Sequence, residues 1–177
     1  MLFPKANCEQ NRLRDEIDQR IGQVSDDARF KAEILREYNL SEAKFNKVLQ
    51  SIVEQYEPFI PLWKMLPQLR KRYKLGIINN GTYLTHPFFE QKYHFSQEFD
   101  GFISSAIEGA CKPGREIYLR ACKILGSPPQ NCLFLDDSLE NITGAQEVGM
   151  QTIHWPDRES GFQTFCGQIR VLNVVKS

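Results

Sequence analysis

The stretch CLFLDDSLENITGAQEVGM, residues 132–150, has the pattern of a buried strand that runs directly into two acids and then into a helix. Four apolar residues open it, and Asp136 and Asp137 follow with no turn residue between. Adjacent carboxylates repel each other, and capping the following helix needs only one side chain, from Asp137 or Ser138. Two carboxylates at a strand end suit a hard cation such as Mg²⁺, which prefers oxygen ligands. We therefore favour a metal site held by both acids over a helix cap, with Asn141 placed to orient one acid.

Strand and helix patterns alternate through the surrounding sequence, which predicts an α/β fold. The expected strands are 74–79, 100–104, 131–137 and 151–155, and the expected helices are 62–73, 114–126 and 139–149. Residues 82–95 have a helical or mixed pattern. This order predicts a Rossmann-like parallel sheet with flanking helices, and ligands bind such sheets at the carboxyl ends of the strands.

The first third of the sequence differs because it has helical periodicity throughout. The expected helices are 9–21, 27–39 and 42–57, with N-caps from Ser25, Asp26 or Asp27 and from Ser41. Pro58 and Pro61 mark a boundary. We predict a small helical cap at 1–57 and an α/β core at 58–177, with no clear element in the tail, residues 157–177.

Composition and charge exclude several classes of protein. The chain has 177 residues, with 22 Lys and Arg against 22 Asp and Glu, and this balance argues against a nucleic-acid or membrane-surface partner. No apolar run approaches the roughly 18 residues of a membrane span, and the N-terminus lacks a signal-peptide pattern. The five cysteines are scattered without a CxxC pair, so we expect free, mostly buried thiols in a cytoplasmic protein. We expect ordinary surface or packing roles for His86, His94 and His154.

The stretch IINNGT, residues 77–82, places polar groups after a predicted strand. Asn79, Asn80 and Gly81 leave the strand end, where amide N–H groups and a permissive glycine suit an anion. An ordinary Asn-Gly turn is the alternative.

The stretch GACKPGREIY, residues 109–118, places a lysine before a predicted helix. Lys112 precedes Pro113, which biases it to an extended conformation at the helix entrance. Its charge can then point back over the strand ends, and a solvated loop lysine is the alternative.

Taken in order along the chain, these three stretches resemble the motifs of the haloacid dehalogenase (HAD)-like hydrolase superfamily, in its helical-cap subfamily. The resemblance covers roughly residues 58–156. It implies a Mg²⁺-dependent phosphatase of small phosphorylated metabolites with an Asp nucleophile. It implies that Asn79 and Lys112 are catalytic, the first contacting the transferring phosphoryl group and the second neutralising its oxygens. The implied substrate-binding residues are Asn79, Asn80, Gly81 and Lys112, the implied Mg²⁺ ligands are Asp136 and Asp137, and Asn141 supports them.

Two departures from the family pattern matter. Asn79 replaces a Ser or Thr, a mild change because an amide also donates to phosphate. The first motif of the family, a strand ending in Asp-x-Asp, is absent from the 177 residues. Covalent catalysis needs a nucleophile, so we expect this chain to be inactive as given, through a gene-start artefact, a truncation or a natural loss. The alternative is a non-catalytic HAD-fold module for binding or oligomerisation; a receiver or nucleotide-binding domain is weaker, because GxGxxG and GxxxxGK[ST] are absent.

The missing strand has structural consequences. In the family it lies mid-sheet, between the strands that end here at Asn79 and Asp136, and unpaired ladder groups are costly when buried. We expect those strands to close up on each other, residues 1–3 to patch the gap, or a second chain to fill it, which predicts self-association into a homo-oligomer. Without a metal, at least one of Asp136 and Asp137 is expected to have a pKa raised by its like-charged neighbour.

Overall fold

The protein is described from a computed structural model, which covers residues 2–4 and 12–174. The chain divides into two compact units, Met1–Cys111 and Lys112–Ser177, called here the N-terminal and C-terminal units. Each unit is described by itself. The predicted boundary between cap and core at residue 57 lies inside the N-terminal unit and stays a prediction.

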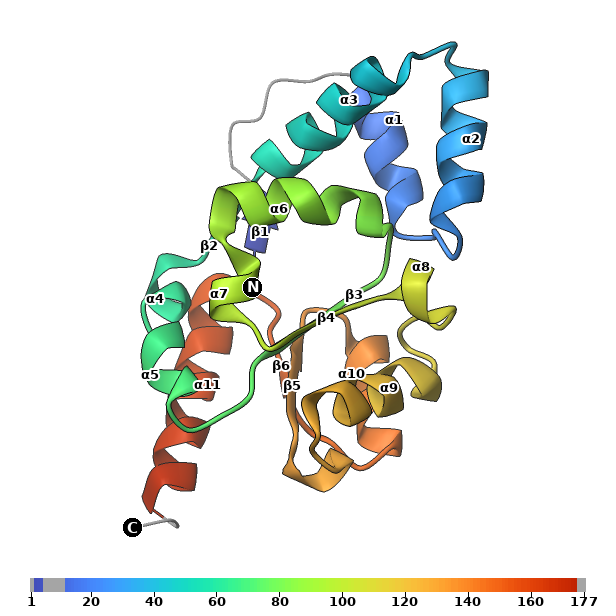
Figure 1. Ribbon diagram of the computed structural model, residues 1–177. Coiled ribbons are helices and arrows are strands. Elements are labelled where there is room, and N and C mark those ends of the chain that lie inside the picture. The colour runs from blue at the N-terminus through green and yellow to red at the C-terminus, as the bar shows by residue number, and fades with distance from the viewer. Residues whose placement is uncertain (1, 5–11, 175–177) are drawn as a thin grey trace. The chain divides into compact units, whose positions relative to one another are not determined.

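Three helices open the N-terminal unit, as the periodicity predicts: α1 (Arg12–Ile21), α2 (Asp27–Glu37) and α3 (Glu42–Glu54) (Figure 1). The Asp26 side chain caps α2 by accepting a hydrogen bond from Arg29 N at 3.0 Å, and Ser41 caps α3 in the same way. Their apolar faces, together with Val24 from the connection between α1 and α2, form one buried cluster, which also contains Ile17, Phe30, Ile34, Phe45, Leu49 and Ile52.

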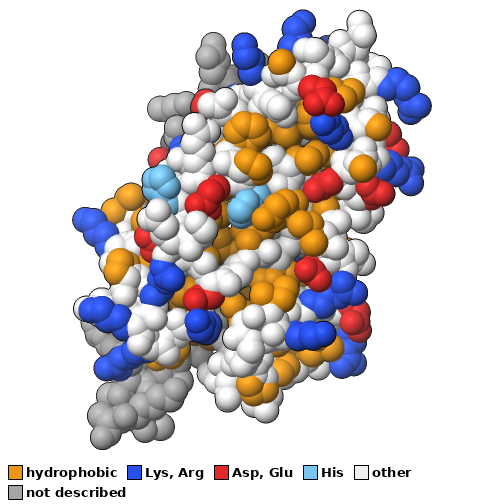
Figure 2. Space-filling model, in the orientation of Figure 1, with side chains coloured by type: hydrophobic (Ala, Val, Ile, Leu, Met, Phe, Trp, Pro, Cys, Tyr) orange, Lys and Arg blue, Asp and Glu red, His pale blue; other side chains and the backbone are white. Residues whose placement is uncertain are grey.

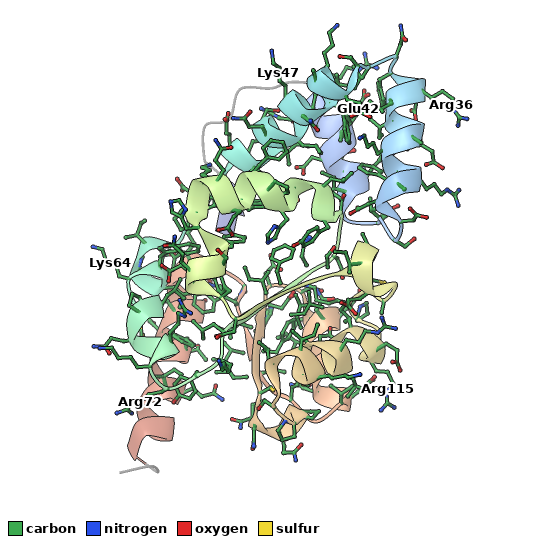
Figure 3. All side chains as sticks on the ribbon, in the orientation of Figure 1. Arg36, Glu42, Lys47, Lys64, Arg72 and Arg115 are labelled. Atoms are coloured by element: carbon green, nitrogen blue, oxygen red, sulfur yellow. The ribbon has the colours of Figure 1, made fainter. Side chains whose placement is uncertain are left out.

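Charged side chains cover the outer faces of these helices. Arg36 and Lys47 are exposed and project away from the helices in Figure 3, whereas the exposed Glu42 of α3 forms an ion pair with Lys31 of α2 at 3.0 Å. On the face drawn in Figure 2, acidic and basic side chains are interspersed over the helices. Apolar residues inside and mixed charges outside explain why these amphipathic segments fold as helices.

The remainder of the N-terminal unit combines short strands and helices. β1 (Leu2–Pro4) pairs antiparallel with β2 (Tyr56–Pro58), and β3 (Gly76–Asn79) pairs parallel with β4 (Gly101–Ser104), with Asn79 opposite Ser104. The other helices among the described residues of this unit are α4 (Ile60–Trp63), α5 (Leu66–Arg70), α6 (His86–Tyr93), α7 (Phe95–Glu98) and α8 (Ser105–Glu108), with a 3₁₀ turn, η1 (Tyr83–Thr85).

The single helix predicted at 62–73 is wrong. The structure instead has α4 and α5, each with a proline in its first turn. Proline lacks the N–H that continues a helix but fits its first turn, so Pro61 and Pro67 begin two short helices. The pairing of β1 with β2 was not predicted either.

The C-terminal unit contains a second parallel pair of strands. β5 (Leu133–Asp136) pairs with β6 (Gln151–His154), with Asp136 opposite His154. The helices are α9 (Arg115–Leu125), α10 (Leu139–Glu147) and α11 (Arg158–Val174), with a 3₁₀ turn, η2 (Pro129–Asn131). The predicted strand–helix alternation is confirmed, and the tail, which had no predicted element, forms α11.

The pairing of the strands corrects one expectation about the missing strand. Among the described residues, β3 pairs with β4 in the N-terminal unit and β5 with β6 in the C-terminal unit, and the closing up of the strands that end at Asn79 and Asp136 stays a prediction. The segment at residues 2–4 pairs with β2 and does not patch a parallel sheet. Self-association stays a prediction.

Candidate functional site

The C-terminal unit contains a buried carboxylate, Asp136, with three hydrogen-bond donors. It lies at the end of β5 and is 6% exposed. Lys112 Nζ donates to Oδ2 at 2.7 Å, and Asn141 Nδ2 donates to Oδ1 at 2.9 Å. The backbone N–H of Ser138 also donates to Oδ1, at 3.0 Å. Both carboxylate oxygens are therefore engaged by the protein.

These contacts set the pKa of Asp136. Burial is the largest single influence and raises the pKa, but the charge of Lys112 and the hydrogen bonds from Lys112, Asn141 and Ser138 lower it. Together they outweigh burial, and the pKa of Asp136 lies below its ordinary value. The expectation of a raised pKa is therefore wrong for Asp136, because a buried cation compensates the negative charge there.

Lys112 points inward from the segment before α9. Its side chain is only 12% exposed, and its ammonium lies 5.7 Å from the centroid of the Phe134 ring, over the ring face. A solvated loop lysine is therefore ruled out. Burial removes the water around both charges of this ion pair. Removing one partner would therefore leave the other charge buried and unpaired, which lowers the stability of the folded protein.

Asp137 lies in a different environment from its neighbour. Successive residues along a strand point to opposite faces, and Asp137 is exposed while Asp136 is buried. The N-cap of α10 is Ser138, which accepts a hydrogen bond from Asn141 N at 3.4 Å. Ser138, one of the two residues predicted as a possible cap, is therefore the cap, and the metal site stays a prediction. His154 Nε2 lies 3.0 Å from the backbone oxygen of Asp137, a contact that the sequence did not predict.

Two contacts hold this arrangement in place. One joins α9 to α10, and the other joins α10 to the segment before α9. Tyr118, fully buried on α9, donates a hydrogen bond from its hydroxyl to the backbone oxygen of Asn141 at 2.8 Å. Gly144 on α10 lies so close to the Pro113 carbonyl that a Cβ at this position would be 2.1 Å from that oxygen. A glycine is needed there to let α10 approach the residue next to Lys112.

The Asn79–Asn80–Gly81 segment belongs to the N-terminal unit, where it follows β3. The N–H of Gly81 donates to Ser105 Oγ at 2.8 Å, and Ser104 Oγ donates to the Gly81 carbonyl at 2.8 Å. Gly81 has a φ of +145°, and a Cβ would lie 2.9 Å from the Ile21 carbonyl oxygen. This glycine is therefore required by its backbone conformation, and its N–H already has a protein partner.

Asp27, at the start of α2, connects that helix to the two residues that follow Gly81. Its carboxylate accepts hydrogen bonds from the Thr82 hydroxyl and from the backbone N–H of Tyr83, the latter at 3.1 Å to Oδ2. Asp27 and the two serines of β4 and α8 were not predicted, because an acid near a helix N-terminus and hydroxyls near a strand end have no distinctive sequence pattern.

The carboxylates of the C-terminal unit provide part of the ligands that a Mg²⁺ site needs. Within the part of the chain that the structure describes, no three His, Cys, Asp or Glu side chains gather closely enough to hold a metal. Mg²⁺ is commonly bound by one or two carboxylates together with waters and substrate phosphate. Asp137 provides one exposed carboxylate of this kind.

Comparisons with known proteins place the chain in a family. The family model of haloacid dehalogenase-like hydrolases matches residues 5–149 of the sequence, and the chain belongs to this family. A sesquiterpene phosphatase of Aspergillus oryzae is 38% identical over 79 residues, covering 43% of this chain and 40% of that protein. The N-acylneuraminate-9-phosphatase of Rattus norvegicus is 28% identical over 98 residues, covering 55% and 40% respectively. The chain thus spans well under two thirds of the length of these curated relatives.

A solved structure shares the fold. A HAD family enzyme of Bacteroides thetaiotaomicron, in complex with magnesium and inorganic phosphate, superposes with a TM-score of 0.64 at 19% identity. The match covers 84% of this chain and 87% of that chain. The predicted α/β, HAD-like fold is therefore confirmed. In addition, the described residues form no helix that is both long and apolar enough to span a membrane.

Proposed function

We propose that the Lys112–Asp136–Asp137 site is part of a Mg²⁺-dependent phosphatase site for small phosphorylated substrates. The observation that carries the proposal is the difference in burial and contacts between the two acids. Asp136 is buried and bonded to Lys112, while Asp137 is exposed. The phosphatases among the relatives support the substrate class.

In this proposal Asp137 holds Mg²⁺ and Asp136 orients Lys112. The ammonium group, which lies 2.7 Å from Asp136, would neutralise oxygens of a phosphoryl group. Bound Mg²⁺ would stabilise the negative charge that develops during phosphoryl transfer. Asn79 and Asn80 remain proposed phosphate contacts, and the cytoplasmic location remains an expectation.

Metal binding gives a direct test of the proposed roles. We expect Mg²⁺ titrated into the 177-residue chain to bind weakly in a calorimeter, and Asp137→Asn to weaken binding at least about tenfold, because a ligand charge is lost. Glu147→Gln is the matched control, since it removes one exposed carboxylate from the C-terminal end of α10, the helix that follows Asp137. Unchanged binding in Asp137→Asn would refute the assignment of Asp137.

A phosphatase assay tests whether this chain lacks a catalytic nucleophile. We expect no hydrolysis of p-nitrophenyl phosphate by this chain with Mg²⁺, because the 177 residues contain no Asp-x-Asp. Turnover that Asp136→Ala abolishes would show that this expectation is wrong. The second candidate, a non-catalytic HAD-fold binding module, is supported by the same missing motif and also predicts inorganic phosphate binding without turnover.

A further inference from the structure

Two cysteines far from the acids lie side by side in the C-terminal unit. Cys122 is on α9, and Cys132 immediately precedes β5. The helix ends at Gly126, which has a φ of +66°, and the N–H of Ser127 donates to the Cys122 carbonyl at 3.0 Å. The chain then reverses through η2, which brings the two Sγ atoms to 3.7 Å.

The two thiols differ in access to solvent. Cys122 is 4% exposed, and Cys132 is partly exposed, with its Sγ 3.4 Å from the Pro128 carbonyl oxygen. Burial, followed by the contact with Cys132, raises the pKa of the Cys122 thiol to about 12. A protonated buried thiol is a poor nucleophile, so a small oxidant reaches and reacts with Cys132 first.

We propose that Cys122 and Cys132 form a dithiol site that hydrogen peroxide converts to an intramolecular disulfide. In the first step the Cys132 thiolate attacks one peroxide oxygen, the O–O bond breaks, and sulfenic acid and hydroxide form. In the second step the Cys122 sulfur attacks the Cys132 sulfur, and the S–O bond breaks. The thiol proton and the hydroxide leave as water, so two thiols and one peroxide give one disulfide and two waters.

The geometry requires only a small movement. A disulfide has an S–S distance of about 2.05 Å, so sulfur atoms now 3.7 Å apart must approach by roughly 1.7 Å. Both cysteines flank a short reversal of the chain, residues 123–131, so the bond forms without bringing distant elements together. The site does not depend on the proposed phosphatase activity.

Peptide mapping of the whole chain tests the proposal. The reduced protein is treated with a few equivalents of hydrogen peroxide, alkylated while unfolded, and digested with trypsin without reduction. Cleavage after Arg120, Lys123 and Arg158 separates the two cysteines, so a disulfide joins the tripeptide 121–123 to the peptide 124–158. We expect this linked peptide as the main oxidised product, with the exposed thiol of Cys111 as an internal comparison.

Two single substitutions serve as controls. In Cys132→Ser we expect Cys122 to stay alkylatable, because the accessible thiol is gone, whereas in Cys122→Ser we expect Cys132 to accumulate as sulfenic or sulfinic acid. We also expect the oxidised wild-type chain to unfold at a higher urea concentration, since the cross-link restricts the unfolded state. The proposal is wrong if Cys122 remains a free thiol after Cys132 has been oxidised, or if Cys132 instead links to Cys111 or to a second chain.

Discussion

At the scale of single residues, Asp136 and Asp137 show how neighbours in sequence acquire different chemistry. The sequence alone suggested mutual repulsion and a raised pKa. The structure separates the side chains, one buried beside Lys112 and the other exposed. The attraction of Lys112 acts at 2.7 Å in a partly desolvated setting, where charges interact more strongly than in water. Each acid can therefore have a role of its own.

Removing Lys112 is expected to destabilise the C-terminal unit. Lys112→Met leaves the Asp136 carboxylate buried without its cation, and breaking a buried pair in this way costs about 3 kcal/mol or more. Urea unfolding at pH 7 measures the loss in the free energy of unfolding. Lys123→Met is the control, since it removes an exposed lysine from α9, the helix that follows Lys112. Equal losses in the free energy of unfolding of both variants would contradict the ion-pair argument.

The destabilisation in Lys112→Met is also expected to depend on pH. The folded-state pKa of Asp136 is lowered, so its stabilising contribution is complete above the unfolded pKa of about 3.9 and is lost as the pH falls through the folded pKa. The difference in stability between wild type and Lys112→Met should therefore shrink as the pH is lowered from about 4 through the folded-state pKa of Asp136. A difference that stays constant over this range would argue against the assigned ionisation of Asp136.

At the scale of elements, α9 and α10 position the residues around Asp136. α10 carries Asn141 near its start, and Gly144 one turn later touches the Pro113 carbonyl. α9 begins three residues after Lys112, and its Tyr118 hydroxyl bonds to the Asn141 carbonyl. The two helices thus fix both side-chain donors to Asp136 through backbone contacts.

Gly144→Ala tests the close approach of α10 to Pro113. A Cβ at 2.1 Å from the Pro113 oxygen must displace the Lys112–Pro113 segment or α10, and overpacking of this kind costs about 1–3 kcal/mol. We expect a lower urea midpoint, and we expect the Lys112 ammonium protons to exchange with solvent faster than in the wild type in NMR spectra, because the contact with Asp136 is disturbed.

Gly167→Ala is the matched control for Gly144→Ala. Gly167 lies on α11, and nothing is within 4 Å of the place where its Cβ would be. Alanine has the higher helix propensity, so this variant should be unchanged or more stable, by up to about 1 kcal/mol. If both variants behave alike, the contact between Gly144 and Pro113 does not matter for stability.

The sequence predicted the elements better than their contacts. Periodicity located α1, α2 and α3 and the alternating strands, because one side of each is apolar. It missed α11, in which Gly161 and Gly167 weaken the helical pattern. Gly161 is needed because a Cβ there would lie 2.3 Å from the Trp155 ring, and contacts of this kind are not visible in a single sequence.

The site was predictable to a similar degree. Lys112, Asp136 and Asn141 were recognised from their order along the chain, and the structure brings the three together in the C-terminal unit. The different exposure of Asp137 and the roles of Tyr118 and Gly144 depend on tertiary packing, which local patterns do not encode.

At the scale of the whole molecule, each unit has its own paired strands and its own buried side chains. The N-terminal unit contains β3–β4 and the cluster around Phe45, and the C-terminal unit contains β5–β6 and Trp155, which is fully buried. Units with separate cores commonly unfold as separate cooperative transitions. We therefore expect urea unfolding in two steps.

The two tryptophans allow each unit to be followed by itself. Trp63 packs against Tyr93, Phe95 and Phe99 in the N-terminal unit, and Trp155 packs against Phe165 in the C-terminal unit. The chain has two Trp residues in all, so Trp63→Phe leaves a reporter of the C-terminal unit, and Trp155→Phe leaves a reporter of the N-terminal unit.

In each single-tryptophan variant, the fluorescence midpoint is compared with the midpoint from far-UV circular dichroism, which averages over both units. We expect the two probes to disagree within each variant, because the signal of one unit is a single step while the average contains two. A comparison within one variant also removes the effect of the substitution itself on stability. Coincident curves with the same slope in both variants would mean that the chain unfolds as one cooperative unit, and the division at Cys111 and Lys112 would then have no thermodynamic counterpart.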